Sequence, residues 1–325
     1  MMYTVPQLSE RINTFITEHP FLRTPEGLYA PVDYVLSMGG KRIRPLLMLM
    51  SYNLYRDDLS PIMNQAMGIE VYHNYTLLHD DLMDRADKRR GKETVHKVWN
   101  DNTAILSGDA MLVLAYQLMA DAPVFCLKRV LDTFGQTALE ICEGQQFDME
   151  FEQRKDVTEQ EYMEMIRLKT SVLLAASLKI GAMMAGAPAE DEQSLYDLGI
   201  NLGLAFQLKD DLLDVYGNPK VFGKNIGGDI LCNKKTYMLI RAFERAEGEQ
   251  LHRLNEWVDA VSYDPQEKIQ AVTALYDALD IKSLCEQKIA YYSRQAALCL
   301  ERVGVPAERK EELKKLMEQL MYRQS

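Results

Sequence analysis

Two aspartate clusters of the same form stand far apart in this chain, and each follows a long apolar stretch of helical character. The first cluster is Asp80-Asp81-Leu82-Met83-Asp84, and the second cluster is Asp210-Asp211-Leu212-Leu213-Asp214. On a helix, the first and last aspartates of each cluster project from one face, because they are four positions apart. Like charges at that spacing repel each other and destabilise an isolated helix. A bound cation would offset that cost.

Helix-forming residues dominate the composition, and runs of alternating β-branched residues are missing, so we expect an all-α fold. Hydrophobic residues make up 47% of the 325 residues and supply a sizeable core. No shift in composition marks a boundary, and we expect one domain over 1–325. Helical periodicity begins near Val5, and it predicts helices over about 61–85, 101–121, 124–152, 159–186 and 190–216, with weaker helices to Tyr322 and breaks near Pro265 and Pro306.

The Gly/Pro-rich stretch from 217 to 228 is the only long loop that the sequence predicts inside the chain. A loop of that length in a compact helical domain is more often a functional lid than a plain connector. Because Lys224 lies in it and Lys234 just beyond it, the loop is suited to closing over a charged ligand.

The overall charge and the cysteines limit the classes of function. A net charge of −11 argues against non-specific binding to nucleic acid or to an anionic membrane. The five cysteines are scattered and form no C-x-x-C pair, which is typical of reduced thiols in the cytosol. The N-terminus lacks the apolar core of a signal peptide, and the most apolar stretch, 172–187, is too short to span a bilayer. We therefore expect a cytoplasmic protein without stable membrane insertion.

The two clusters offer hard oxygen ligands with no histidine or cysteine among them, a set that suits magnesium. Magnesium binds through a few carboxylates and usually shares its coordination shell with substrate phosphates. The sequence therefore predicts two magnesium-binding clusters that act on one diphosphate. The alternative is two solvated acidic helix ends, but each cluster interrupts an apolar run instead of preceding one. The predicted metal ligands are Asp80, Asp81, Asp84, Asp210, Asp211 and Asp214.

Basic residues surround the first cluster in the sequence. The motif GGKRIRP supplies Lys41 and Arg44 as phosphate ligands, although a solvated surface turn is an alternative interpretation. His73 lies seven residues before Asp80 and shares its helix face, although it could equally be a hydrogen-bonded core histidine. Arg89 and Arg90 follow the cluster and are placed to hold phosphate oxygens that no metal reaches.

Polar residues also accompany the second cluster. Lys169 and Thr170 stand inside an apolar helix, where an unpaired ammonium would be costly, so we expect Lys169 to point into a polar cavity. Gln207 lies three residues before Asp210 and shares its face.

Taken together, the motifs GGKRIRP, HNYTLLHDDLMD, RRG, KT, FQLKDDLLD and GKNIGGDILCNKKT make the chain resemble the trans-type isoprenyl diphosphate synthases from about Gly39 to Thr236. The resemblance implies the isoprenoid synthase fold, with antiparallel helices around a deep cavity, and a homodimer. It also implies a magnesium-dependent prenyltransferase that condenses isopentenyl diphosphate head to tail with an allylic diphosphate.

The resemblance assigns roles to the candidate residues. About three magnesium ions would join the first cluster and the second, mainly Asp210, to the allylic diphosphate and promote its departure. Thr170 and Gln207 would offer oxygen dipoles to the carbocation. Arg89, Lys169, Lys224 and Lys234 would assist the departing diphosphate, and isopentenyl diphosphate would bind without metal to Lys41, Arg44, His73 and Arg90.

The resemblance also bears on the length of the product. In this family a bulky residue five positions before the first aspartate forms the floor of the cavity. In this chain that residue is Tyr75, and the smaller Thr76 lies beside it. An ideal helical wheel instead places Tyr72 and Thr76 nearer the aspartate face. The pattern favours a geranylgeranyl product, with farnesyl next. Two departures from the family are Asn233, where many members have glycine, and a tail with Arg323 in place of a basic run.

Two rival functions remain. A terpene cyclase also ionises an allylic diphosphate with magnesium, but it typically has one Asp-rich motif and does not need Lys41, Arg44 and His73. A non-catalytic regulatory subunit of a heteromeric prenyl synthase has usually lost one Asp cluster, whereas this chain keeps both.

Overall fold

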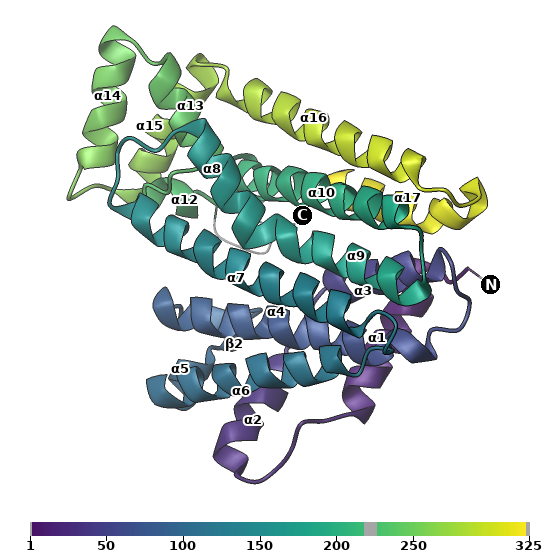
Figure 1. Ribbon diagram of the computed structural model, residues 1–325. Coiled ribbons are helices and arrows are strands. Elements are labelled where there is room, and N and C mark those ends of the chain that lie inside the picture. Colours follow the sequence, from purple (N-terminus) through teal and green to yellow (C-terminus); the bar gives the residue numbers. More distant parts are fainter. Residues whose placement is uncertain (1, 218–225, 323–325) are drawn as a thin grey trace. The chain divides into compact units, whose positions relative to one another are not determined.

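The computed structural model describes residues 2–217 and 226–322, and in these ranges the chain is almost entirely helical (Figure 1). The only strands in the described ranges, β1 (Lys88–Arg89) and β2 (Lys92–Glu93), pair in antiparallel fashion in the charged segment after the first cluster. The all-α prediction is therefore confirmed. Lys224, Arg323 and most of the predicted lid lie outside the described residues.

The contacts of the chain group it into two compact units. Unit 1 comprises Met1–Gln136, Ala176–Tyr196 and Val303–Leu313, and unit 2 comprises Thr137–Ala175, Asp197–Arg302 and Lys314–Ser325. The prediction of a single domain stays a prediction. The helices are α1 (Val5–Glu18), α2 (Glu26–Ser37), α3 (Ile43–Asn53), η1 (Ser60–Ile62), α4 (Met63–Met83), α5 (Val95–Val98), α6 (Asp101–Ala120), α7 (Leu127–Glu152), α8 (Glu159–Ile166), η2 (Arg167–Ser171), α9 (Val172–Ala185), α10 (Ala189–Tyr216), α12 (Gly228–Leu231), α13 (Tyr237–Arg245), α14 (Gly248–Asp259), α15 (Pro265–Ala278), α16 (Ile281–Arg302) and α17 (Ala307–Tyr322).

Helix boundaries follow from local chemistry that the sequence displays. Pro61 lies in the 3₁₀ turn η1 that leads into α4, where its missing N–H costs nothing. The side chain of Asn100 accepts a hydrogen bond from the N–H of Thr103 and caps α6. Thr158 and Glu161 form a reciprocal capping box at the start of α8. These boundaries agree with the predicted helices to within a few residues.

Unit 1 is built around α4, which packs closely against α6. The first half of α4 is mostly apolar and largely buried, as expected of a helix enclosed by others. Tyr72 anchors this packing, because its ring meets that of Phe134 edge to face with centroids 5.1 Å apart. The buried half of α4 thus fixes the position of the acidic half that follows it.

In unit 2 the predicted helix over 159–186 contains an interruption, because residues Arg167–Ser171 form the π-helical turn η2 between α8 and α9. Such turns inside helices occur frequently at functional sites, and this one carries Lys169 and Thr170. Gly144 of α7 lies so close that a Cβ there would be 2.5 Å from the backbone nitrogen of Lys169. The glycine therefore allows α7 to approach the turn.

Two helical stretches are long and apolar enough to span a membrane by length and composition alone, namely Asp101–Ala120 and Glu159–Ala185. The second is 83% buried, which is typical of a core helix in a soluble protein. The absence of stable membrane insertion stays a prediction.

Candidate active site

The first cluster occupies the last turn of α4 in unit 1. Asp81 is 6% exposed, and its Oδ2 lies 2.7 Å from Nε of Arg89. Asp80 is half-buried, and Asp84 is exposed and caps the helix, with its N–H bonded to the carbonyl of Asp80. Because the C-terminal end of a helix carries partial negative charge, carboxylates there are destabilising unless a cation lies nearby. Arg89 supplies one such cation.

The predicted phosphate ligands Arg44 and His73 are in contact. Nη1 of Arg44 donates to Nε2 of His73 over 3.0 Å, so the histidine is neutral and carries its proton on Nδ1. Burial, followed by the positive charges of Arg44 and Arg90, lowers the pKa of His73 well below its ordinary value of 6.5. Such a concentration of positive charge is suited to binding an anion.

The guanidinium of Arg44 has unused hydrogen-bonding capacity. Its Nε is buried and has no hydrogen-bond partner among the described residues. Burial lowers the pKa of Arg44 to about 10, Glu70 opposes this shift, and Arg90 adds to it. A buried donor without an acceptor is costly, and a phosphate oxygen would satisfy it.

The glycine-rich loop meets the arginine that follows the first cluster. Nη1 of Arg90 donates to the carbonyl oxygen of Gly39. Gly40 has φ +135, and a Cβ there would lie 2.8 Å from the guanidinium carbon of Arg90. Glycine is favoured at this point by its backbone conformation, and it leaves room for the guanidinium of Arg90. Lys41 is exposed beside this contact.

Sequence reasoning missed Arg42, which holds the same loop from inside. Arg42 has φ +49, and its guanidinium is paired with Glu70 over 2.6 Å in a buried ion pair. It also donates to the carbonyl of Leu36, and Asn74 donates to the same Glu70 carboxylate. The available signal was an acid, Glu70, inside an apolar helical run. Arg42 thereby places its neighbours Lys41 and Arg44.

The residues predicted to set product length lie on two sides of α4. Tyr72 is 1% exposed and belongs to the core, whereas Tyr75 is half-buried and packs edge to face on His79 with centroids 4.8 Å apart. The two tyrosine rings are in contact at 5.5 Å. The Thr76 hydroxyl bonds to the carbonyl of His73. Tyr75 is thus the more accessible of the two aromatic rings.

The second cluster lies near the end of α10 in unit 2, and both carboxylate oxygens of its middle residue accept hydrogen bonds. Asp211 is 3% exposed, accepts a hydrogen bond from the Tyr162 hydroxyl at Oδ2, and accepts another from Nε2 of Gln207 at Oδ1 over 3.0 Å. Oε1 of Gln207 in turn accepts from the Thr170 hydroxyl over 3.0 Å. The structure therefore joins three predicted site residues in one chain and adds Tyr162, which the sequence analysis did not single out.

The charge of the second cluster is only partly neutralised. Burial first, and then the nearby Asp229, raise the pKa of Asp211 to about 6, while Lys234 and the two hydrogen bonds oppose this shift. The carboxylate of Asp214 accepts from the N–H of Asp229 over 2.9 Å and so ties α12 to α10. Asp210 is half-buried.

Lys169 forms an ion pair that the sequence did not reveal. Its ammonium lies 2.6 Å from Oδ2 of Asp148 on α7, and both side chains are about one-fifth to one-quarter exposed. The expected polar surroundings are therefore present, and Asp148 is part of them. No spacing in the sequence links residues so distant along the chain.

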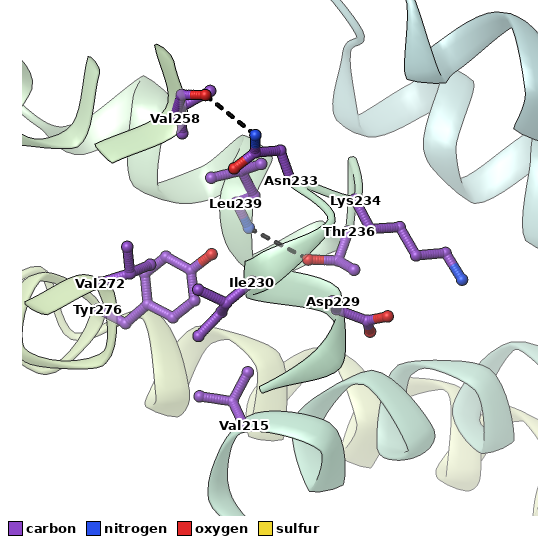
Figure 2. Close-up of a pocket in the computed structure, with 10 residues that line it drawn as sticks. All are labelled: Val215, Asp229, Ile230, Asn233, Lys234, Thr236, Leu239, Val258, Val272 and Tyr276. Carbon is purple, nitrogen blue, oxygen red and sulfur yellow. Dashed lines mark hydrogen bonds between the residues drawn. The ribbon is translucent and has the colours of Figure 1, made fainter. Parts of the chain in front are cut away.

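A small pocket beside α12 contains Asp229 and Lys234 (Figure 2). Figure 2 shows both side chains projecting to the same side of the turn after α12, away from the apolar wall that includes Tyr276. The turn thus presents one cation and one anion together.

The donors of both clusters fit magnesium. In the part of the chain that the structure describes, no three His, Cys, Asp or Glu side chains converge on one point. Magnesium does not need such an all-protein cage, because it usually takes one or two carboxylates and completes its shell with water and phosphate. In each cluster the outer aspartates offer oxygen ligands one helical turn apart.

Comparison with known proteins gives three kinds of match. The family model described as polyprenyl synthetase matches residues 25–276. A geranylgeranyl pyrophosphate synthase from Geoglobus acetivorans is 42% identical over 246 residues, which are 75% of this chain and 75% of that protein. A geranylgeranyl diphosphate synthase from Methanosarcina mazei is 41% identical over 240 residues, 73% of this chain and 74% of that protein. A crystal structure of a geranylgeranyl pyrophosphate synthase has a TM-score of 0.95 at 43% identity and covers 100% of both chains.

Proposed function

The chain belongs to the polyprenyl synthetase family and is a prenyltransferase, and from this premise we propose that it condenses isopentenyl diphosphate head to tail with an allylic diphosphate. Its fold is the isoprenoid synthase fold of the matched synthase. The product is a short-chain trans-prenyl diphosphate, and the reaction depends on magnesium.

The observation that carries the proposal is the state of Arg44. Its buried Nε lacks an acceptor among the described residues, and its Nη1 is held by neutral His73. Arg90 adds a second guanidinium to the same region. These groups, with Lys41, suit the diphosphate of isopentenyl diphosphate, which they bind by charge-assisted hydrogen bonds without a metal ion.

Magnesium would be held by Asp80, Asp81 and Asp84 of the first cluster and mainly by Asp210 of the second cluster. When bound, it would neutralise charge on the leaving diphosphate of the allylic substrate. Lys169 and Lys234 donate to oxygens of the leaving diphosphate. The Thr170 and Gln207 dipoles face the carbocation, and their chain of hydrogen bonds to Asp211 fixes their orientation.

The product that the relatives' names and the residues favour is geranylgeranyl diphosphate, with farnesyl diphosphate next. We assign the floor of the product cavity to Tyr75, because it is the accessible ring of the pair. Tyr75→Ala should lengthen the product, measured by chromatography of the dephosphorylated prenols, and Tyr291→Phe on the exposed face of α16 is the matched control. An unchanged product distribution would move the floor to Tyr72 or elsewhere.

The proposal includes a homodimer in the cytoplasm. Three large apolar side chains lie exposed along α6, with Ile105 46%, Leu106 60% and Val113 57% exposed. A second copy of the chain would cover such a stripe. Light scattering after size-exclusion chromatography tests this, and Leu106→Glu should shift a dimeric mass to a monomeric one.

The decisive assay incubates the pure protein with magnesium, labelled isopentenyl diphosphate and each allylic primer in turn. We expect label in a prenyl diphosphate, and we expect no product when the metal is chelated. Consumption of the allylic substrate without isopentenyl diphosphate, giving a cyclic hydrocarbon, would favour a terpene cyclase. A metal-replete protein that turns over no primer would instead favour a regulatory subunit.

A further inference from the structure

Lys268 on α15 is a buried lysine to which the proposed reaction gives no role. Its relative exposure is 0%, and its ammonium lies 2.7 Å from Oδ1 of Asn233 and 3.5 Å from the carbonyl oxygen of Leu231. The same ammonium lies 4.2 Å from the ring centroid of Tyr263. No carboxylate in the described part of the chain lies within ion-pair distance of it. A buried ammonium with only neutral partners is costly, so a methionine of similar shape would be the simpler core residue.

The two hydrogen-bond acceptors of Lys268 are Leu231, the last residue of α12, and Asn233, in the turn that follows it. Asn233 has φ +52, and its Nδ2 donates to the carbonyl of Val258 on α14 over 3.0 Å (Figure 2). Its amide is therefore held at both ends, by Lys268 and by Val258. The carbonyl of Leu231, at the end of α12, accepts from the Tyr263 hydroxyl as well. Lys268 thus holds the C-terminal end of α12 and the residue that follows it.

The next residue is Lys234. Its N–H bonds to the carbonyl of Asp229 over 2.9 Å, which completes the turn. Figure 2 shows its side chain projecting to the same side as that of Asp229, whose N–H is bonded to the Asp214 carboxylate of the second cluster. A glycine in place of Asn233 would adopt the left-handed backbone with less strain, but it would offer Lys268 no acceptor.

We propose that Lys268 is a positioning residue, whose buried ammonium locks the turn at Leu231–Asn233 and so directs Lys234 at the allylic diphosphate. The inference rests on the proposed function, because Lys234 is the group that touches substrate. Misplacing a charged ligand by about an ångström is enough to slow a reaction up to a hundredfold.

The test measures steady-state kinetics for Lys268→Met and Asn233→Gly. For both variants we expect the KM for the allylic diphosphate to rise about tenfold to a hundredfold, with the KM for isopentenyl diphosphate unchanged. The matched control is Lys282→Met, because Lys282 is exposed and lies 5.0 Å from the ring of Tyr216, and this variant should keep wild-type constants. Binding of inorganic diphosphate with magnesium, by calorimetry, should weaken in parallel.

A double-mutant cycle with Lys234→Ala distinguishes positioning of Lys234 from a merely structural role of Lys268. If Lys268 acts through Lys234, adding Lys268→Met to Lys234→Ala should change the allylic KM no further. Additive losses, or equal rises in both KM values, would overturn the inference. If Lys268→Met does not fold, Asn233→Gly tests the same inference, because it removes the acceptor of the Lys268 ammonium. Wild-type protein without turnover would refute the proposed function and this inference with it, whereas an active wild type with unaltered variants refutes the inference alone.

Discussion

The two aspartate clusters look alike in sequence but are neutralised in different ways. In unit 1 the buried Asp81 is paired with the guanidinium of Arg89. In unit 2 the equally buried Asp211 accepts hydrogen bonds from the neutral donors Tyr162 and Gln207. The two clusters have the same spacing of acids, but the buried acid of the first cluster forms an ion pair, whereas the buried acid of the second cluster accepts hydrogen bonds from neutral side chains.

The electrostatic surroundings of the two buried acids differ as well. Arg44, Arg89 and Arg90 all raise the positive potential around His73, close to the first cluster in the sequence. Around Asp211 the Asp229 carboxylate adds negative charge, and the pKa of Asp211 is raised to about 6. We conclude that the surroundings of Asp211 disfavour its charged form, so a cation bound nearby would stabilise that form.

The largest expected effect concerns turnover. Asp81→Ala and Asp210→Ala should each lower kcat/KM by on the order of 10²–10³, because each removes a proposed metal ligand from a site where charge develops. Raising the magnesium concentration should restore part of the activity of Asp81→Ala and less of Asp210→Ala. The control is Asp132→Ala, since Asp132 is exposed and forms a surface ion pair with Lys128. Wild-type rates in either cluster variant would refute its metal assignment.

The next prediction tests the basic residues of unit 1 separately from the aspartates. Arg44→Gln should raise the KM for isopentenyl diphosphate about tenfold to a hundredfold, because a hydrogen bond to a charged group contributes about 1.5–3 kcal/mol. The KM for the allylic diphosphate should stay the same. Arg11→Gln is the matched control, because this arginine stacks on the ring of Tyr3. Equal rises in both constants would show that the arginine serves both diphosphates.

A third effect tests the neutral donors of unit 2. Tyr162→Phe should lower the free energy of unfolding by about 1.5–3 kcal/mol, because it removes a buried hydrogen bond to the Asp211 carboxylate. Chemical denaturation measures it, with Tyr291→Phe, an exposed tyrosine, as control. Added magnesium should recover little of the loss if Asp211 is bound only by protein donors. A full recovery would indicate that Asp211 is itself a metal ligand.

Much of the fold could be predicted from the sequence because it depends on local signals. Pro61, Asn100 and the Thr158 capping box mark helix starts that any reader of the sequence can find. The acids of both clusters were equally visible, since their spacing is a property of one helix. Residue type and short spacing were thus sufficient for these features.

The partners of those acids were not predictable, because they come from other helices. Nothing in the spacing connects Asp211 with Tyr162, or Lys169 with Asp148. The π-helical turn at Lys169 was missed for the same reason, since it accompanies the approach of α7 at Gly144. The sequence therefore shows where charge is placed, and only packing shows how each charge is balanced.

The smallest expected effect is the pH dependence of stability that His73 gives to unit 1. Burial and the neighbouring arginines hold the pKa of His73 well below 6.5, so the folded protein keeps this side chain neutral while the unfolded chain binds a proton. That contribution to stability is fully present above pH of about 6.5 and is lost as the pH falls below it. His73→Asn should remove up to about 1.4 kcal/mol per pH unit of the acid-induced loss.

Denaturation curves at a series of pH values between neutral and mildly acidic measure this slope. His252→Asn is the matched control, because His252 lies on the surface of unit 2 with 67% of its side chain exposed, and its removal should leave the slope unchanged. An identical slope in wild type and His73→Asn would mean that the histidine binds a proton equally well in the folded and the unfolded chain. A buried histidine beside arginines would then need an anion near it, and the first cluster could no longer be contrasted with the second as the one surrounded by cations.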